Sequence, residues 1–255
     1  MIDLLHNPLF FATAIPAVIL VGLSKGGFGG AMAVVGVPLM ALAIPPVRAA
    51  AILLPILMMM DGAALWAWRH GPRDLKTFKN VLPGAAIGVG FGWLVAAIVT
   101  EAMVKLIVGL IAFGFVARWL WQKLARREKI HAHNAVTGTF WGALSGFTSF
   151  VAHAGGPAYQ VYTLPLRQDP KTYTATIVVF FAIVNAMKLI PYFALGELDT
   201  SNLLAAFSLA PVAIVSTVAG AAVVKRMRAE IFYPITYGLV FLLSLKLIYD
   251  GTAGL

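Results

Sequence analysis

The sequence contains no cysteine, and this absence excludes disulfide bonds, thiolate catalysis and thiolate metal sites. Charge is also scarce. Asp, Glu, Lys and Arg make up 11% of the 255 residues, whereas an average soluble protein has about 25%. Nineteen basic and ten acidic side chains are too few to cover the surface of a soluble domain of this length. Disordered, coiled-coil and soluble nucleic-acid-binding proteins are excluded on the same grounds.

Apolar residues dominate what is present. They make up 60% of the chain, and the mean hydropathy is +0.88. The apolar sequence runs the length of the chain and leaves no hydrophilic block for a separate catalytic domain. We therefore predict an all-α, polytopic helical membrane protein. The N-terminal residues lack the positive segment of a cleaved signal peptide, so we expect the first apolar stretch to be retained.

Six stretches have the roughly 20 apolar residues that one membrane-spanning helix requires. They are residues 49–68, 81–100, 102–121, 172–193, 203–224 and 231–249. Two further stretches, 9–44 and 135–166, are interrupted by glycine-rich segments, and glycine and proline disfavour helix interiors. We expect each to form a broken hairpin of two shorter helices, giving about eight transmembrane segments as such chains are commonly counted.

Basic residues concentrate in the loops 69–79, 118–129 and 225–228, which hold twelve of the nineteen Lys and Arg. Such loops are cytoplasmic as a rule, and if the N-terminus lies outside, the two broken hairpins enter from opposite sides. Residues 1–125 and 126–255 then form two inverted repeats, each a broken hairpin followed by three helices, within one transmembrane domain. Similar residues recur at an offset of about 124–126 positions, as in Gly29 and Gly155, or Asp61 and Asn185. Inverted repeats with broken helices are typical of secondary transporters.

The tips of the two hairpins, residues 25–30 and 153–157, are the candidate substrate site. Irregular backbone inside a membrane occurs only where it is buried in protein or lines a wet cavity. Exposed amide groups, a lysine and a histidine at such tips favour an anion. The predicted substrate-binding residues are Lys25, Gly26, Gly27, Gly29, Gly30, Ser149, His153, Gly155, Gly156, Tyr159 and Asn185.

Asp61 is the only acidic residue inside a predicted span, and an intramembrane carboxylate is a candidate functional group. Two roles are open: a structural ion pair with Lys25, or proton coupling, which His153 could also provide. Lys188 lies near the end of its span, and we interpret it as a lysine that reaches the membrane interface. Trp66 and Trp68 adjoin a basic loop, where interfacial aromatic residues are expected.

Other chemistries have weaker support. His131 and His133 lack a third metal ligand, so we predict no metal site and no cofactor. The sequence offers no credible set of nucleophile, base and orienting residue for hydrolase or protease chemistry. We therefore predict that the protein is not an enzyme.

At the two tips the sequence resembles the sulfite exporter TauE/SafE family, also called the 4-toluene sulfonate uptake permease family. The resemblance covers nearly the whole chain and rests on three segments, 22–30 with 37–39, 142–157 and 185–189. It implies a multi-pass permease of the bacterial inner membrane for anions such as sulfite, sulfonates or sulfoacetate. Ser24 and Lys25 before the glycines depart from the commoner pattern of the family, which leaves the individual substrate open.

The combined hypothesis is a carrier that works by alternating access, with the small anion and the lipid bilayer as its partners and no nucleic acid. Proton coupling and homo-oligomer formation are both left open. The alternatives are a passive anion channel, a carrier of another small anion such as a carboxylate, and an integral membrane enzyme or assembly factor.

Overall fold

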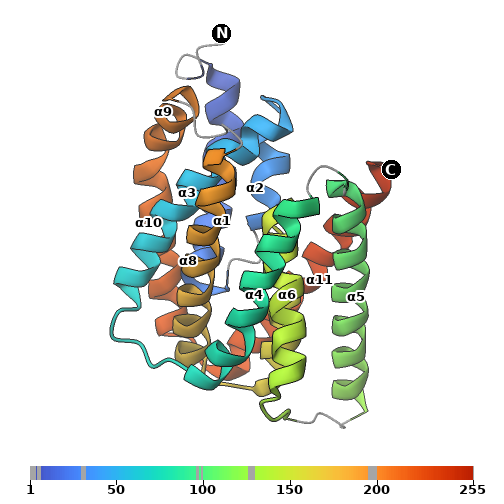
Figure 1. Cartoon of the computed structure of the whole chain (residues 1–255). Helices are drawn as coiled ribbons and strands as arrows, with labels where there is room; N and C mark the ends of the chain where they lie inside the picture. The colour runs from blue at the N-terminus through green and yellow to red at the C-terminus, as the bar shows by residue number, and fades with distance from the viewer. Residues whose placement is uncertain are drawn as a thin grey trace. The chain divides into compact units, whose positions relative to one another are not determined.

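The computed structural model describes residues 4, 7–29, 33–95, 98, 100–125, 130–194 and 200–254. Within these residues the chain forms helices and connecting segments but no strand, which confirms the all-α prediction (Figure 1). The α-helices are α1 (Pro8–Gly27), α2 (Ala33–Met40), α3 (Pro46–Ala67), α4 (Leu75–Val95), α5 (Glu101–Leu124), α6 (Ala135–Ala152), α7 (Gly155–Thr163), α8 (Pro170–Ala194), α9 (Thr200–Ser208), α10 (Ala210–Lys225) and α11 (Ala229–Ala253). A short 3₁₀ helix, η2 (Leu164–Leu166), follows α7.

Six of the described helices, α1, α3, α4, α5, α8 and α11, are long and apolar enough to cross a membrane. A seventh span is formed if α9 and α10 count as one, but these two helices meet at a bend of 50°. The predicted span over 203–224 is therefore two helices joined at a bend and not one continuous helix. The break falls at Leu209, just before Pro211 in the first turn of α10, where proline cannot continue the preceding helix.

Both predicted helix breaks are present. The first separates α1 from α2, and the second, at His153 and Ala154, separates α6 from α7. The first hairpin is more asymmetric than expected, because α1 has 20 residues and α2 only 8. The expectation of two shorter helices is thus wrong for α1. His153 ends α6 with a φ of 50°, a left-handed conformation that is uncommon for a residue other than glycine.

The chain divides into two compact units. Unit 1 comprises residues 1–71 and 177–226, and unit 2 comprises residues 72–176 and 227–255. Each unit therefore holds one broken hairpin together with helices from the other half of the sequence. The first hairpin packs on α10, and the second packs on α4. The repeat boundaries at 1–125 and 126–255 and the inverted symmetry stay predictions.

Glycine allows α1 and α10 to approach closely in unit 1. A Cβ atom added to Gly26 would lie 2.9 Å from the backbone nitrogen of Ala221. On the facing helix, a Cβ atom on Gly220 would lie 2.9 Å from Cα of Leu23. Small residues that bring two backbones together are a common way to pack membrane helices. This contact fixes the end of α1 that leads into the first tip.

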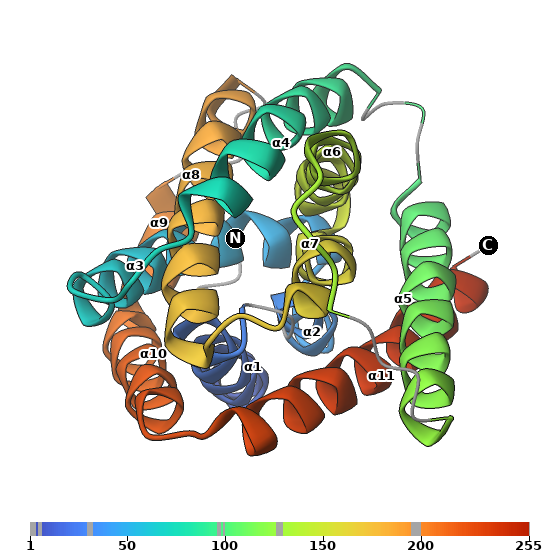
Figure 2. The ribbon, with the colours of Figure 1, turned by 90° about the horizontal axis from the view of Figure 1, so that it is seen from below.

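The same kind of packing joins α4 to α6 in unit 2 (Figure 2). Cβ atoms added to Gly84 and Gly88 would lie 2.8 Å from the backbone nitrogens of Ala143 and Phe147, respectively. The contact runs along α6 toward the second tip. Each tip is therefore placed by a long helix held at backbone distance from a neighbour.

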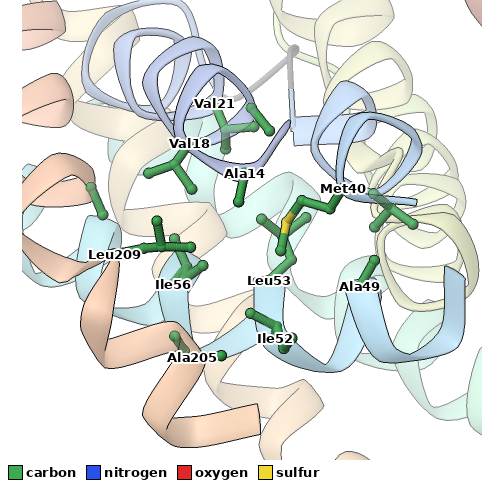
Figure 3. Packing of buried hydrophobic residues seen from close by; sticks show 14 of the residues in the cluster. Ala14, Val18, Val21, Met40, Ala49, Ile52, Leu53, Ile56, Ala205 and Leu209 are labelled. Carbon is green, nitrogen blue, oxygen red and sulfur yellow. The ribbon is translucent and has the colours of Figure 1, made fainter. Parts of the chain in front are cut away.

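A hydrophobic core holds the rest of unit 1 together. Side chains from α1, α2, α3 and α9, with Leu209, meet in one buried cluster (Figure 3). Ala14, Val18, Val21, Met40, Ala49, Ile52, Leu53, Ile56, Ala205 and Leu209 are its labelled members. All ten are at most 1% exposed. The cluster anchors α3 against α1, and these two helices carry the charged residues described next.

Candidate functional site

Lys25 and Asp61 form a buried ion pair in unit 1. Lys25 lies in the last turn of α1 and Asp61 lies on α3, and the Lys25 ammonium donates a hydrogen bond to Oδ1 of Asp61. The two residues are 6% and 3% exposed. Asn185 on α8 donates from Nδ2 to the other carboxylate oxygen, Oδ2, at 2.7 Å. The structure thus contains the ion pair that the sequence left as one of two roles for Asp61.

Lys188 belongs to the same cluster. It follows Asn185 by about one helical turn on α8, is fully buried, and donates to Oδ1 of Asn185 at 3.4 Å. Its interpretation as an interfacial lysine is therefore wrong, because its side chain lies inside the protein. Asp61 is the only acidic residue among those that the structure describes in unit 1. The cluster consequently combines two lysines and an amide with a single described carboxylate.

The space beside this cluster is very small. A cavity of about 10 Å³ is lined by Lys25, Gly29, Asp61 and three apolar residues of α8, Ile177, Val178 and Phe181. That volume holds about one water molecule. Gly29 has a φ of 73°, and a side chain there would meet Ile177, so glycine suits both the turn and the space. The cluster is closed in this structure and has no room for an oxyanion.

Trp68 connects the end of α3 to the first tip. Its indole Nε1 donates to the backbone oxygen of Gly26 at 2.8 Å, and the side chain is 2% exposed. Lys225 lies over the Trp68 ring, 5.3 Å from the centroid, and donates to the backbone oxygen of Ala67. The interfacial interpretation is wrong for Trp68, whereas Trp66 is 61% exposed and fits it.

This difference between the tryptophans was available in the sequence. Residues two positions apart on an α-helix point about 200° away from each other, because each residue turns the helix by about 100°. Trp66 and Trp68 at the end of α3 therefore point to opposite sides of the helix, and this spacing predicts different environments for them.

Replacing Trp68 with phenylalanine should destabilise the protein by about 1–3 kcal/mol, because it leaves the buried oxygen of Gly26 without its donor. Thermal unfolding of the purified protein in detergent measures the effect. Trp66→Phe is the matched control and should leave the melting temperature within error. Equal melting temperatures for the two variants would contradict the role assigned to the Trp68 hydrogen bond.

The remaining predicted residues of the first tip have different surroundings. Gly26 and Gly27 face α10, where added side chains would meet Thr217, Gly220 and the neighbouring backbone. Their lack of a side chain thus has a packing reason, and a ligand role for their backbone stays a prediction. Gly30 lies outside the described residues.

The second tip, in unit 2, is folded back onto α6. Ser145 donates from Oγ to the backbone oxygen of Gly155 at 2.8 Å, and Thr148 donates from Oγ1 to that of Ala154 at 3.2 Å. In return, the Ala154 backbone N–H donates to the backbone oxygen of Thr148 at 3.0 Å. His153 is 6% exposed. The predicted residues Ser149, Gly155, Gly156 and Tyr159 are buried as well.

Asp74, which the sequence did not single out, organises the start of α4 outside the membrane-length helices. Its Oδ1 accepts the backbone N–H groups of Lys76 at 2.9 Å and Thr77 at 3.3 Å, and His133 Nε2 lies 3.1 Å from Oδ2. Burial acts to raise the pKa of this carboxyl, but the hydrogen bonds from Thr77, the nearby His133 and the Lys76 N–H together hold it below its ordinary value. Gln168 also donates to Oδ2. His133 is thus part of a helix cap, and no group of three metal-ligating residues occurs in the described part of the chain.

Membrane-length helices, two broken hairpins and buried charge inside one of the units are features of a membrane transporter. The sequence profile of the family described as Sulfite exporter TauE/SafE matches residues 14–247, and the chain belongs to this family. Membership makes it a membrane protein of an anion and sulfite transporter class, which agrees with the expectation that it is not an enzyme. No curated protein and no solved structure matches the chain significantly.

Proposed function

We propose that the protein is a secondary transporter that moves small sulfur-containing anions, such as sulfite, sulfonates or sulfoacetate, across the bacterial inner membrane by alternating access. The observation that carries this proposal is the buried cluster in unit 1, where Lys25 and Lys188 lie with one carboxylate, Asp61. Family membership supports the anion class.

The hydrogen-bond donors of this cluster suit an anion. Burying a charge is costly unless it is paired and hydrogen-bonded. The carboxylate of Asp61 is the acceptor that pairs with the Lys25 ammonium, and an entering anion can take its place. The anion then accepts from Lys25 and Asn185 in place of Asp61, beside Lys188 on the same helix as Asn185. Protonation of Asp61 would release the same donors, which gives the proposal a route to proton coupling.

The second tip, in unit 2, has anion-binding features of its own. Gly155 and Gly156 begin α7, whose first N–H groups and positive dipole end favour an anion. His153 adjoins them and gains a charge when protonated, and Ser149 and Tyr159 offer hydroxyl groups. Convergence of the two tips on one substrate follows from the inverted-repeat hypothesis and is part of the proposal.

The size of the cavity favours a carrier over a channel. Conduction through a channel needs a continuous wet path, whereas the space at Lys25 and Asp61 holds about one water. A carrier passes through closed states of this kind. The apolar lining residues Ile177, Val178 and Phe181 must move before an anion can enter.

Transport of labelled sulfite and of a labelled sulfonate into proteoliposomes tests the function. We expect saturable uptake that responds to an imposed proton gradient, and at least a tenfold loss in Lys25→Ala and His153→Ala. Lys105→Ala is the control, since Lys105 pairs with Glu101 on α5 and belongs to neither tip. If Lys25→Ala and His153→Ala both transport like the wild type, the assigned site is wrong. Non-saturable, gradient-independent flux would favour the channel, and preferential uptake of a carboxylate would favour the other anion class.

A further inference from the structure

Unit 2 contains a much larger cavity that the proposed transport site does not use. Its volume is about 930 Å³, and its walls come from α5, the segment before α6, α6 itself, α7 with η2, and α11. Its lining residues include the end of α5 and the start of α6, which flank a basic loop that the sequence places on the cytoplasmic side. The volume far exceeds what a small oxyanion needs and falls within the range of sites for larger organic ligands.

The charged residues of this cavity are all basic. Arg118 at the end of α5, Arg167 after η2 and His131 before α6 line it, and the described lining contains no Asp or Glu. Arginine is well suited to phosphate because its planar guanidinium donates two parallel hydrogen bonds. The cavity therefore selects for an anionic group.

Five of the thirteen other lining residues are aromatic. Trp119 stacks on Tyr237 with ring centroids 4.0 Å apart, and Trp141 contributes another indole. The buried Nε1 of Trp119 has no hydrogen-bond acceptor among the described residues. Aromatic rings with a polar edge suit a ligand that is apolar at one end and polar at the other. The occupant should thus be an amphiphile with an anionic head.

The cavity is already shaped without a ligand. The His131 backbone N–H donates to the Pro165 oxygen at 3.0 Å, which fastens the segment before α6 to η2. Tyr162 accepts at its hydroxyl from Asn80 Nδ2 at 2.9 Å. Arg167 is held over the ring of Tyr233, 4.7 Å from its centroid. A preformed site of this kind costs little ordering free energy when a ligand binds.

Apolar surface surrounds the cavity on the same helices. Leu120 and Leu124 on α5 are 49% and 77% exposed, and Val136 and Phe140 on α6 are 81% and 61% exposed. In a membrane protein such side chains face lipid tails. Arginines beside lipid-facing apolar residues, at the predicted cytoplasmic end, match the basic pockets between helices that bind the headgroups of anionic lipids.

We propose that this cavity binds one anionic phospholipid, with the phosphate at Arg118, Arg167 and His131 and the acyl chains along the apolar faces of α5 and α6. The inference is independent of the proposed transport function, because it uses no residue of the unit 1 cluster. The same chemistry could be presented by a soluble amphiphilic anion, so the experiment must separate the two sources.

Native mass spectrometry of the full-length protein with added phosphatidylglycerol or phosphatidylcholine tests the proposal. The wild type should retain one phosphatidylglycerol molecule in preference to phosphatidylcholine. Removing both arginines in Arg118→Gln/Arg167→Gln should weaken phosphatidylglycerol binding roughly 30-fold, if each contributes about the affinity of one basic residue near an anionic membrane. Lys76→Gln/Lys79→Gln, which removes two exposed basic residues at the start of α4, is the matched control and should bind within twofold of the wild type.

A variant that fills the cavity keeps the test independent of charge. Thr137→Trp places a large ring in the lining and should lower phosphatidylglycerol retention while leaving the net charge unchanged. Equal losses in the arginine double variant and the lysine control would overturn the proposal, as would equal retention of the two lipids. Binding of millimolar decyl sulfate that the arginine variants weaken, with no effect of those variants on lipid retention, would assign the cavity to a soluble amphiphile instead.

Discussion

Asp61→Ala is expected to destabilise the protein by about 3–5 kcal/mol, the usual cost of breaking a buried ion pair by removing one partner. The substitution leaves Lys25 and Lys188 buried together without the carboxylate, and it removes the acceptor of Asn185 Nδ2. Thermal unfolding in detergent should show a clear fall in melting temperature. Uptake of sulfite into proteoliposomes should fall to background.

The double variant Lys25→Met/Asp61→Leu separates stability from transport. It replaces the ion pair by apolar side chains of similar size, and such replacements are often neutral for stability. We expect it to recover most of the melting temperature that Asp61→Ala loses, yet to remain inactive because both groups act on the anion. Wild-type transport by this double variant would refute the role given to the cluster. Wild-type stability of Asp61→Ala would show that the ion pair does not support the fold.

Gly88→Ala should be the other severe substitution, with a loss of about 3 kcal/mol, at the upper end of the usual cost of overpacking. The added Cβ would lie 2.8 Å from the backbone nitrogen of Phe147, so α4 and α6 would have to separate. Because α6 ends at the second tip, transport should fall as well. Unfolding in detergent, followed by circular dichroism, measures the loss.

Gly90→Ala is the control for this substitution on the same helix. Nothing lies within 4 Å of a Cβ atom at Gly90, and alanine is about 1 kcal/mol better than glycine in a helix interior. We expect its stability to equal or slightly exceed that of the wild type. If Gly88→Ala and Gly90→Ala behave alike, close contact between α4 and α6 is not what holds unit 2 together.

Hydropathy was enough to predict most of the helices, because the length of an apolar stretch is a one-dimensional property. It also located both helix breaks, since glycine and proline interrupt such stretches visibly. The offset that relates Asp61 to Asn185 pointed to two residues that the structure joins by a hydrogen bond. Lys25 and Asp61 were predicted because any charge inside an apolar stretch needs a physical reason.

What the sequence could not provide was direction around each helix. Lys188 was misplaced because its position near the end of a span does not say which face of α8 it occupies, and that face is buried. The bend at Leu209 was missed because hydropathy continues through it, although Pro211 was a usable signal. The role of Asp74 depends on segments far apart in the chain, His133 and Gln168 among them, which only the fold brings together.

The carboxylate of Asp61 has a consequence for selectivity if the cluster binds substrate as proposed. This carboxylate competes with the substrate for the same hydrogen-bond donors. It is part of the chain, so its effective concentration is high, and both of its oxygens already accept hydrogen bonds. A free carboxylate offers the same two acceptor atoms without the tether, so exchanging one for the other gains little. A sulfonate or sulfite group has three oxygens and can satisfy Lys25, Asn185 and Lys188 together. Asp61 would thus make the cluster selective for sulfonates and sulfite over carboxylates.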